Sequence, residues 1–285
     1  MATSSPAGID LSNRVVIMTG GSRGLGRAMA WGLLRAGAKV TLAAVDSIEA
    51  AVADAEKDFG KGRVVGLTCD VRQRADCEKV VAETVKAFGK VDMLVNDAAL
   101  GMRHVAEAPN SKSTKFWEAD PDRWRDVIDV NVIGGFFMAH AVAPHLVRQG
   151  WGRIVNVTTS IGTMQRKDNS PYGVTKAAME AATLIWSQEL EGTGVTMNTL
   201  IPGGAADTTM VFGARGSSRL LPPEIMVPPI LWLASTLSDG QSGGRYVGNL
   251  WDESLPPSDA AKKAKEAPVL RVPSDAQRVG SVVRQ

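Results

Sequence analysis

The chain has 285 residues, with 32 basic and 30 acidic side chains and a net charge of +2 at pH 7. This small surplus excludes electrostatic attraction as the main route to nucleic acid or to an acidic membrane, so neither partner is expected. Glycine is abundant at 29 residues, while aromatic residues make up only 5%. That composition favours many tight backbone turns over a sandwich built on aromatic core pairs.

The N-terminal residues 1–13 lack a basic region followed by an apolar stretch, so no secretory signal is expected. Cys69 and Cys77 give neither a disulfide framework nor zinc-ligand spacing, so no metal site is expected. The longest charge-free run, residues 130–147, contains Asn131, two histidines and a proline, and it predicts a buried helix rather than a membrane span. A cytoplasmic location is therefore expected.

Short apolar runs alternate with segments of helical periodicity along most of the chain. The predicted strands are Val15–Met18, Val40–Val45, Val64–Leu67, Met93–Val95, Ile154–Val157 and Val195–Ile201. The predicted helices are Leu25–Ala36, Ile48–Phe59, Arg74–Phe88, Arg123–Val147 and Val174–Leu190. Because apolar strands that alternate with helices form parallel sheets covered on both faces, residues 1–252 are predicted to form one Rossmann-type α/β domain. It would be a doubly wound parallel sheet in a three-layer α/β/α arrangement, with ligands at the carboxyl ends of the strands.

The composition changes at the end of the chain. Residues 252–285 carry five acidic and six basic side chains, four prolines and no aromatic residue. Such a segment buries little apolar surface. We therefore predict that residues 253–285 form a charged, proline-containing C-terminal tail, either partly disordered or lying on a partner.

A glycine-rich turn joins the first predicted strand to the first predicted helix. Glycine allows a positive φ and close approach of a ligand, and a helix N-terminus offers free N–H groups to a pyrophosphate. A strand-to-helix turn also uses glycine where no ligand binds, but its place at the start of the alternation favours dinucleotide binding. The predicted cofactor-binding residues of this turn are Thr19, Gly20, Ser22, Arg23, Gly24, Leu25 and Gly26.

The charges near this turn favour NADP(H) over NAD(H). A carboxylate at the end of the second strand would accept hydrogen bonds from the ribose hydroxyls of NAD, but Ala44 stands at that position. Asp46 lies two residues later, and Arg23 in the turn is placed to meet a 2′-phosphate. The alternative is that Arg23 is simply solvated and that Asp46 caps the next helix.

Tyr172 and Lys176 lie four residues apart and share one face of a predicted helix. They follow Thr158-Thr159-Ser160 at the end of the fifth predicted strand, which places them at the same sheet edge as the glycine turn. Lowering a tyrosine pKa from about 10 to about 7 requires roughly 4 kcal/mol. An ammonium about 4 Å away supplies roughly that energy at an effective dielectric near 20. We therefore expect Lys176 to lower the pKa of Tyr172.

The combined pattern resembles the short-chain dehydrogenase/reductase family, in its ordinary-length branch, over about residues 10–250. The glycine turn and the Tyr–Lys pair match the family's motifs, and Asn96-Asp97-Ala98-Ala99 matches its Asn-Asn-Ala-Gly segment with changes. By this resemblance the further cofactor-binding residues are Asp70, Val71, Asn96, Ala98, Tyr172, Lys176, Pro202, Gly203 and Thr208.

The resemblance implies hydride transfer between a nicotinamide cofactor and a small carbonyl compound or secondary alcohol. Tyr172 would be the general acid/base, and Lys176 would lower its pKa and hold the nicotinamide ribose. Asn131 would position a water that links Lys176 to solvent. The resemblance also implies a homo-tetramer or a homo-dimer.

The catalytic hydroxyl has two candidates. The resemblance places Thr159 at the family's usual serine position, 13 residues before Tyr172. Ser160 is the alternative, although it is expected to point to the other face of the strand end. The predicted catalytic set is therefore Asn131, Thr159, Tyr172 and Lys176.

Two other functions share parts of this pattern. A dehydratase or epimerase of the same family can reuse the Tyr–Lys pair, but such enzymes usually have a longer chain with a larger substrate domain. A non-catalytic nucleotide sensor would be expected to lack Tyr172 or Lys176, and both are present. The oxidoreductase is therefore the preferred prediction.

Overall fold

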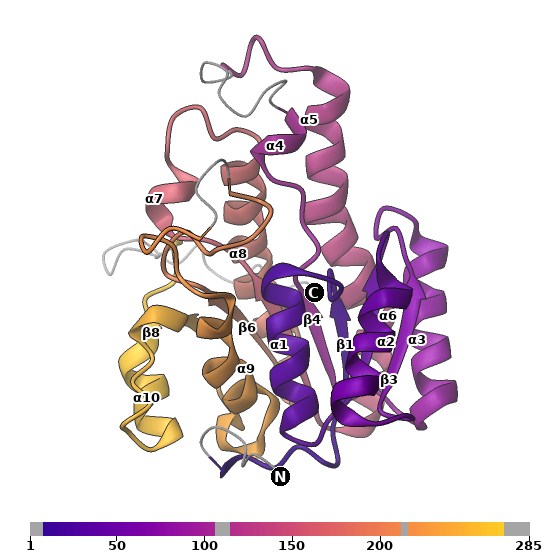
Figure 1. The fold of residues 1–285 in the computed structure, drawn as a ribbon. Coiled ribbons are helices and arrows are strands. Elements are labelled where there is room, and N and C mark those ends of the chain that lie inside the picture. The colour runs from indigo at the N-terminus through magenta and orange to yellow at the C-terminus, as the bar shows by residue number, and fades with distance from the viewer. Residues whose placement is uncertain (1–7, 106–114, 212–215, 271–285) are drawn as a thin grey trace, which may run out of the picture.

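The structure is a computed structural model that describes residues 8–105, 115–211 and 216–270 (Figure 1). Within this part of the chain one eight-stranded sheet has the order β3-β2-β1-β4-β5-β6-β7-β8. Its first seven strands are parallel, and β8 runs antiparallel to β7. The strands are β1 (Val15–Thr19), β2 (Lys39–Ala44), β3 (Val64–Thr68), β4 (Met93–Asn96), β5 (Gly152–Val157), β6 (Val195–Ile201), β7 (Arg245–Val247) and β8 (Lys265–Glu266).

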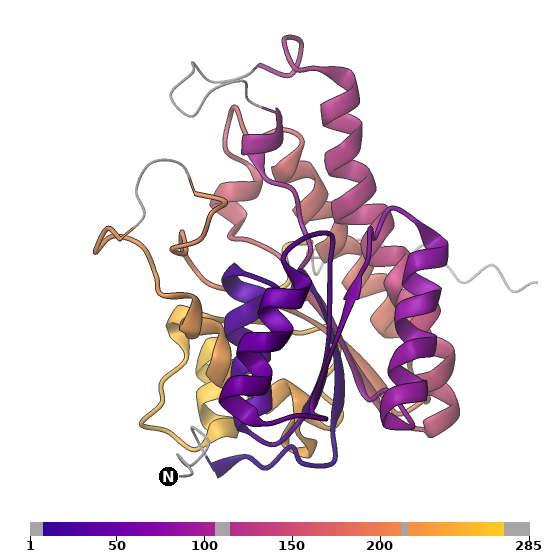
Figure 2. The same ribbon diagram turned by 45° about the vertical axis from the view of Figure 1, so that its right-hand side comes forward.

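Helices cover both faces of this sheet, as the two views show (Figures 1 and 2). One face carries α1 (Gly24–Arg35), α2 (Ile48–Phe59) and α9 (Val227–Ala234), and α10 (Pro257–Ala264) packs beside α9. The other face carries α3 (Arg74–Phe88), α6 (Gly134–Gln149) and α8 (Tyr172–Glu189). The predicted doubly wound, three-layer α/β/α fold is therefore confirmed.

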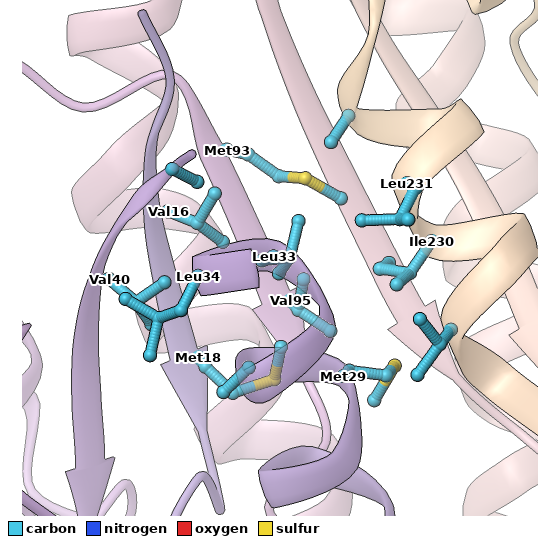
Figure 3. Packing of buried hydrophobic residues seen from close by; sticks show 14 of the residues in the cluster. Val16, Met18, Met29, Leu33, Leu34, Val40, Met93, Val95, Ile230 and Leu231 are labelled. Carbon is cyan, nitrogen blue, oxygen red and sulfur yellow. The ribbon is translucent and has the colours of Figure 1, made fainter. Parts of the chain in front are cut away.

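The strands are apolar throughout because each one contributes to two cores. Val16 and Met18 of β1 pack on the α1 and α9 side, whereas Ile17 between them packs on the α3 and α6 side. Neighbouring residues of a strand point to opposite faces, so a sheet covered on both sides needs a continuous apolar run. Figure 3 shows the first of these cores, where Met29 and Leu33 of α1 lie between the sheet and α9.

The strand order places a switch point between β1 and β4. The chain runs outward from β1 through β2 to β3, and it then returns to the other side of β1 to form β4. The loops after β1 and β4 therefore part to opposite sides of the sheet. This divergence leaves a crevice at the carboxyl ends of the strands, where doubly wound sheets bind their ligands.

The predicted helix over residues 123–147 forms as three connected pieces. α5 (Pro121–Ile128) begins with Asp120, whose side chain accepts hydrogen bonds from the backbone N–H groups of Asp122 and Arg123. A π-helical turn, Asp129–Ile133, joins α5 to α6.

Two further short helices follow the carboxyl ends of β4 and β5, namely α4 (Met102–Val105) and α7 (Ile161–Met164). Single 3-10 turns span Pro223–Met226, Thr236–Ser238 and Gly248–Leu250.

Much of the expected C-terminal tail packs onto the domain. The helix α10 buries Ala260, Ala261 and Ala264, and β8 then adds to the sheet edge beside β7. Alanine buries little area per residue, so a helix whose buried residues are all alanines carries little sequence signal of burial. Packed structure thus continues past residue 252, while residues 271–285 lie outside the described part of the chain.

We predict that Ala260→Leu destabilises the whole protein. Ala260 is fully buried, and added methylenes in a packed site cost about 1–3 kcal/mol. Lys262→Ala, on the exposed side of the same helix, is the control and changes the stability by less than about 0.5 kcal/mol. Urea unfolding measures both free energies. Equal stabilities of the two variants would show that α10 does not contribute to the folded domain.

Candidate active site

The glycine turn between β1 and α1 brings the backbone close to the end of β4. Gly20 has a φ of +68°, and a Cβ at this position would lie 2.9 Å from the backbone nitrogen of Ala98. A Cβ at Gly26 would lie 2.5 Å from the carbonyl oxygen of Gly20. Both positions therefore require glycine. The turn leaves the N-terminus of α1, a 12-residue helix, open toward the crevice.

A cavity of about 320 Å³ occupies this crevice. Its lining includes most of the predicted cofactor residues, namely Gly20, Ser22, Arg23, Gly24, Leu25, Asp70, Val71, Ala98 and Thr208. Backbone close to a helix N-terminus and a cavity at the switch point together form the kind of site that holds a dinucleotide. The residues present therefore fit NAD(P).

Two arginines that line this cavity, Arg23 and Arg72, form ion pairs with carboxylates. Arg23 Nη1 lies 3.1 Å from Asp46 Oδ2, and both side chains are about half exposed. The guanidinium predicted to meet a 2′-phosphate thus already neutralises a carboxylate. Arg72 lies 2.8 Å from Asp70 and 2.8 Å from Asp126, and its hydrogen bonds lower the pKa of the Asp70 carboxyl.

Two predicted cofactor residues have their side chains engaged inside the protein. The Thr19 hydroxyl donates a hydrogen bond to the Val95 carbonyl, 3.3 Å away, and accepts one from the Ala98 N–H at 3.1 Å. Asn96 Nδ2 donates to Asn156 Oδ1 at 3.0 Å. These side chains join neighbouring strand ends below the cavity, so they support the cavity floor.

Pro202 and Gly203 follow the end of β6. Gly203 has a φ of +88°, and a Cβ there would lie 2.0 Å from Asn249 Oδ1, so this turn also requires glycine. Thr208 returns toward the glycine turn, where a Cβ at Gly24 would lie 3.4 Å from its methyl group. The loop after β6 thus closes the cavity on the side opposite Asp70.

Tyr172 and Lys176 lie on the first two turns of α8, beside the end of β5. Lys176 is 4% exposed, and its Nζ donates a hydrogen bond to the Val157 carbonyl at 2.8 Å. The same Nζ lies 5.7 Å from the centre of the Tyr172 ring. Thr159 forms a side-chain hydrogen bond that lowers the pKa of Tyr172. The structure therefore brings Thr159, Tyr172 and Lys176 together.

The Ser160 hydroxyl has a different role. Ser160 is the N-cap of α7, and its Oγ accepts a hydrogen bond from the Thr163 N–H and lies 2.9 Å from the Thr163 hydroxyl. A side chain that caps a helix is directed along that helix. Between the two candidate hydroxyls, this geometry favours Thr159.

The pKa of Tyr172 differs from the sequence expectation in its direction. Burial raises it to about 12, and the negative charge of Asp97 also raises it. Burial lowers the pKa of Lys176 to about 8. The net shift of the Tyr172 pKa is therefore upward, because desolvation of the phenolate outweighs any attraction from the Lys176 ammonium.

Asn131 occupies the π-helical turn between α5 and α6. Its amide accepts a hydrogen bond from the Leu100 N–H at 2.7 Å, donates to the Leu100 carbonyl at 2.9 Å and donates to Thr175 Oγ1 at 3.0 Å. A second, small cavity of about 10 Å³ is lined by Asn131 and Lys176 together with Thr19, Asn96 and Asn156. The two predicted catalytic residues are thus neighbours across a space of about one water molecule.

Asp97 belongs to the site, although the sequence identified it only as a departure from a motif. Its carboxylate accepts a hydrogen bond from the Gly26 N–H, and a Cβ at Gly26 would lie 2.7 Å from Asp97 Oδ2. Desolvation raises the pKa of Asp97 to about 7, against the attraction of Lys176. In the sequence, the signal is that Asp97 stands where the family motif has an asparagine. Only the fold shows that its carboxylate faces the Gly26 N–H and the Lys176 ammonium.

The match to known proteins agrees with this geometry. The family model described as short chain dehydrogenase matches residues 14–216. The chain is 30% identical over 217 residues to a short-chain type dehydrogenase/reductase of Picea abies, covering 74% of this chain and 77% of the relative. It therefore belongs to the short-chain dehydrogenase/reductase family, and it is an NAD(P)-dependent oxidoreductase that acts on CH–OH groups.

Two further relatives resemble the chain over most of its length. The fluoren-9-ol dehydrogenase of a Terrabacter species is 30% identical and covers 94% of this chain and 86% of its own. A short-chain dehydrogenase of Shigella flexneri, solved in complex with NADP, superimposes with a TM-score of 0.75 at 22% identity. That alignment covers 87% of this chain and all of the Shigella chain, and it confirms the fold.

We predict that Asp97→Asn flattens the pH dependence of stability between about pH 4.5 and 7.5. The folded protein keeps a proton on Asp97 up to a pKa of about 7, whereas the unfolded chain loses it near the ordinary 3.8. Wild-type stability therefore falls as the pH rises through this window. Asparagine has the same shape without the charge. The free energy of unfolding of the variant, relative to wild type, should therefore rise by about 1–2 kcal/mol from the acidic to the alkaline end of this pH window.

Urea unfolding at several pH values measures this difference. Asp54→Asn, which removes an exposed carboxylate paired with Arg27, is the matched control for loss of one surface charge. If the Asp97→Asn and wild-type curves ran parallel across the window, the Asp97 carboxyl would not be the group that titrates there.

Proposed function

We propose that this enzyme uses NADP(H) to interconvert a small carbonyl compound and the matching secondary alcohol, with Tyr172 as the proton donor and acceptor. The observation that carries the proposal is the grouping of Thr159, Tyr172 and Lys176 next to Asp97, which lines the cavity of the glycine turn. The named substrate of the Terrabacter relative, fluoren-9-ol, is a secondary alcohol, which makes fluorenone a rational first compound to test.

The chain's own part in the reaction is to hold the substrate oxygen and to move one proton. A bound nicotinamide supplies or accepts the hydride. In carbonyl reduction the Tyr172 hydroxyl donates its proton to the oxygen as negative charge develops there, and the Thr159 hydroxyl stabilises the same oxygen. In alcohol oxidation Tyr172 must first lose its proton. With a pKa raised to about 12, this step needs more nearby positive charge than Lys176 alone provides.

Asn131 and the small cavity provide a path for the next proton. Lys176 lines this cavity with Asn131, and its ammonium can return a proton to Tyr172 after each turnover. A Lys176 pKa of about 8 makes proton exchange with a water in that cavity feasible near neutral pH. The relay thus runs from solvent past Asn131 to Lys176 and on to Tyr172.

The first experiment follows NADPH consumption with a panel of ketones and aldehydes. We expect Tyr172→Phe to lower kcat by about 100-fold or more while cofactor binding is retained, because general acid catalysis contributes about 10²–10⁴. Thr159→Val should cost about 100-fold, whereas Ser160→Ala should leave kcat within a few-fold. Full activity of Thr159→Val with an inactive Ser160→Ala would reverse the assignment of the hydroxyl. Tight NADPH binding without any turnover would instead favour a nucleotide sensor.

The preference for NADP(H) rests on Arg23. Its guanidinium is exposed at the rim of the cavity, where the adenosine ribose of a dinucleotide held by the glycine turn would lie. A 2′-phosphate carries more charge than the Asp46 carboxylate and offers a planar guanidinium two acceptor oxygens. Arg23 can therefore exchange one anionic partner for a stronger one.

Arg23→Ala should weaken NADPH binding by at least about tenfold and NADH binding by less than about threefold, since a hydrogen bond to a charged group contributes about 1.5–3 kcal/mol. Arg27→Ala is the matched control, because Arg27 lies one turn further along α1 and pairs with Asp54. Titration of cofactor fluorescence gives both dissociation constants. Equal losses for the two cofactors in Arg23→Ala would refute the 2′-phosphate role.

We further propose that the protein is a cytoplasmic homo-oligomer. Phe136 on α6 and Val174 and Ile185 on α8 are about half exposed, and Phe136 also contacts Trp186 of α8. Apolar side chains on two adjacent helices form a surface that a second copy can cover, as a dimer or a tetramer. The molecular mass measured by sedimentation decides between these states.

The cytoplasmic location is supported by the two free, buried cysteines, Cys69 and Cys77, which fit a reducing compartment.

A further inference from the structure

Arg245 is a fully buried cation behind the active site. It begins β7, at the sheet edge remote from the glycine turn, and is 1% exposed. A buried guanidinium is costly unless carboxylates and carbonyls satisfy it. The partners of Arg245 come from three different segments, and two of them, Thr159 and Glu180, belong to or neighbour the residues of the proposed chemistry.

The first partner is Thr159 itself. Arg245 Nη2 donates a hydrogen bond to the Thr159 carbonyl at 2.9 Å. Thr159 lies between the end of β5 at Val157 and the start of α7 at Ile161, so neither element's regular hydrogen bonds hold it. The bond from Arg245 therefore fixes the peptide that carries the Thr159 hydroxyl.

The second partner is Glu180 on α8. Arg245 Nε lies 3.4 Å from Glu180 Oε1, and Glu180 is 2% exposed. Glu180 follows Lys176 by four residues, so the two side chains share one face of the helix. The same carboxylate accepts a hydrogen bond from the hydroxyl of Thr158, next to Thr159. Arg245 thus joins the helix of the Tyr–Lys pair to the loop of the hydroxyl.

The third partner is Glu266 in β8. Arg245 and Glu266 are directly opposite in the antiparallel β7–β8 pair, and Arg245 Nη1 lies 3.2 Å from Glu266 Oε2. Glu266 is partly exposed, with 42% of its side chain accessible. It holds the guanidinium from the side opposite Glu180. Loss of Glu266 would remove one of the three groups that hold the guanidinium in this orientation.

We propose that Arg245 is a positioning residue that sets the Thr159 hydroxyl against Tyr172, and that Glu266 makes the C-terminal strand β8 part of this support. The proposal rests on the proposed function, since it assigns Arg245 and Glu266 to the same reaction. A displacement of about 1 Å at a reacting group can cost about 100-fold in rate. Loss of the support should therefore lower kcat and leave cofactor binding unchanged.

The test compares substitutions of two neighbouring residues in β8. Glu266→Ala should lower kcat by about tenfold, with unchanged NADPH affinity. Glu266→Gln should recover much of that loss, because its amide oxygen still accepts a hydrogen bond from Arg245. Lys265→Ala is the matched control: Lys265 is exposed in the same strand and reaches Gln241 at 3.4 Å. It should keep wild-type kcat.

Arg245→Lys provides an independent arm. Lysine keeps the positive charge near Glu180, but its single nitrogen cannot replace the three guanidinium nitrogens that contact three separate partners. We expect a loss in kcat at least as large as in Glu266→Ala. The rising limb of the pH profile of alcohol oxidation should also move to higher pH, because the hydrogen bond from Thr159 lowers the pKa of Tyr172. A loss of folding alone would not move that limb.

The outcomes separate the two proposals. Wild-type kcat and an unmoved limb in both Glu266→Ala and Arg245→Lys would overturn the positioning role while the proposed function stands. Equal kcat losses in Glu266→Ala and Lys265→Ala would also overturn it, because they would reflect disturbance of the strand in general. Absence of turnover in the wild-type protein would instead contradict the proposed function.

Discussion

The close approach of Gly20 to Ala98 at the switch point is the constraint on which the site depends. β1 pairs with β2 on one side and with β4 on the other, so the segments leaving β1 and β4 separate just beyond this contact. A side chain at Gly20 would push the two strand ends apart. The contact places the N-terminus of α1 over the crevice, and the loops after β3 and β6 then form its two ends. The carboxyl end of β5 lies at the same end of the sheet, and with it lie the residues of the proposed chemistry.

Burial of charge is the second physical theme of this site. Lys176 is flanked by two carboxylates, Asp97 toward the glycine turn and Glu180 one helical turn away, and both raise its pKa against the effect of burial. Asp97 stabilises the charged form of Lys176. At Tyr172, by contrast, its negative charge disfavours the charged form, the phenolate, and so raises the pKa. The charge of Asp97 therefore acts on the pKa of both members of the Tyr–Lys pair. Arg245 links this group of buried charges to the far edge of the sheet through Glu180.

The fold could be predicted from the sequence because six apolar strands and the helices between them follow simple periodic patterns. The bounds of α3, Arg74–Phe88, agree at both ends. The region after β6 could not be predicted, for local reasons. α9 is apolar on all sides and begins with two prolines, so it shows no helical periodicity. The strand β7 has only three residues, and α10 packs through alanines. The π-helical turn at Asn131 leaves no mark in a pattern read at 3.6 residues per turn.

The candidate site was predictable to a different degree. The spacing of Tyr172 and Lys176 and the position of the glycine turn predict that the main groups lie at the same end of the sheet. The direction of the Tyr172 pKa was not predictable, because it depends on desolvation and on Asp97, which comes from another strand end. Arg245 was equally hidden, since its partners lie 86, 65 and 21 residues away in the chain.

The arrangement of α8 also bears on how this enzyme can change. Tyr172, Lys176 and Glu180 repeat every four residues along one rigid helix face, and each contacts or approaches the end of β5 or β6. The segment that borders the start of this helix, residues 161–171, lies outside it. An insertion within α8 would rotate part of this row away from the sheet, whereas the bordering segment can change length without turning it. The spacing of the proposed catalytic pair can therefore be kept while the bordering segment changes in length.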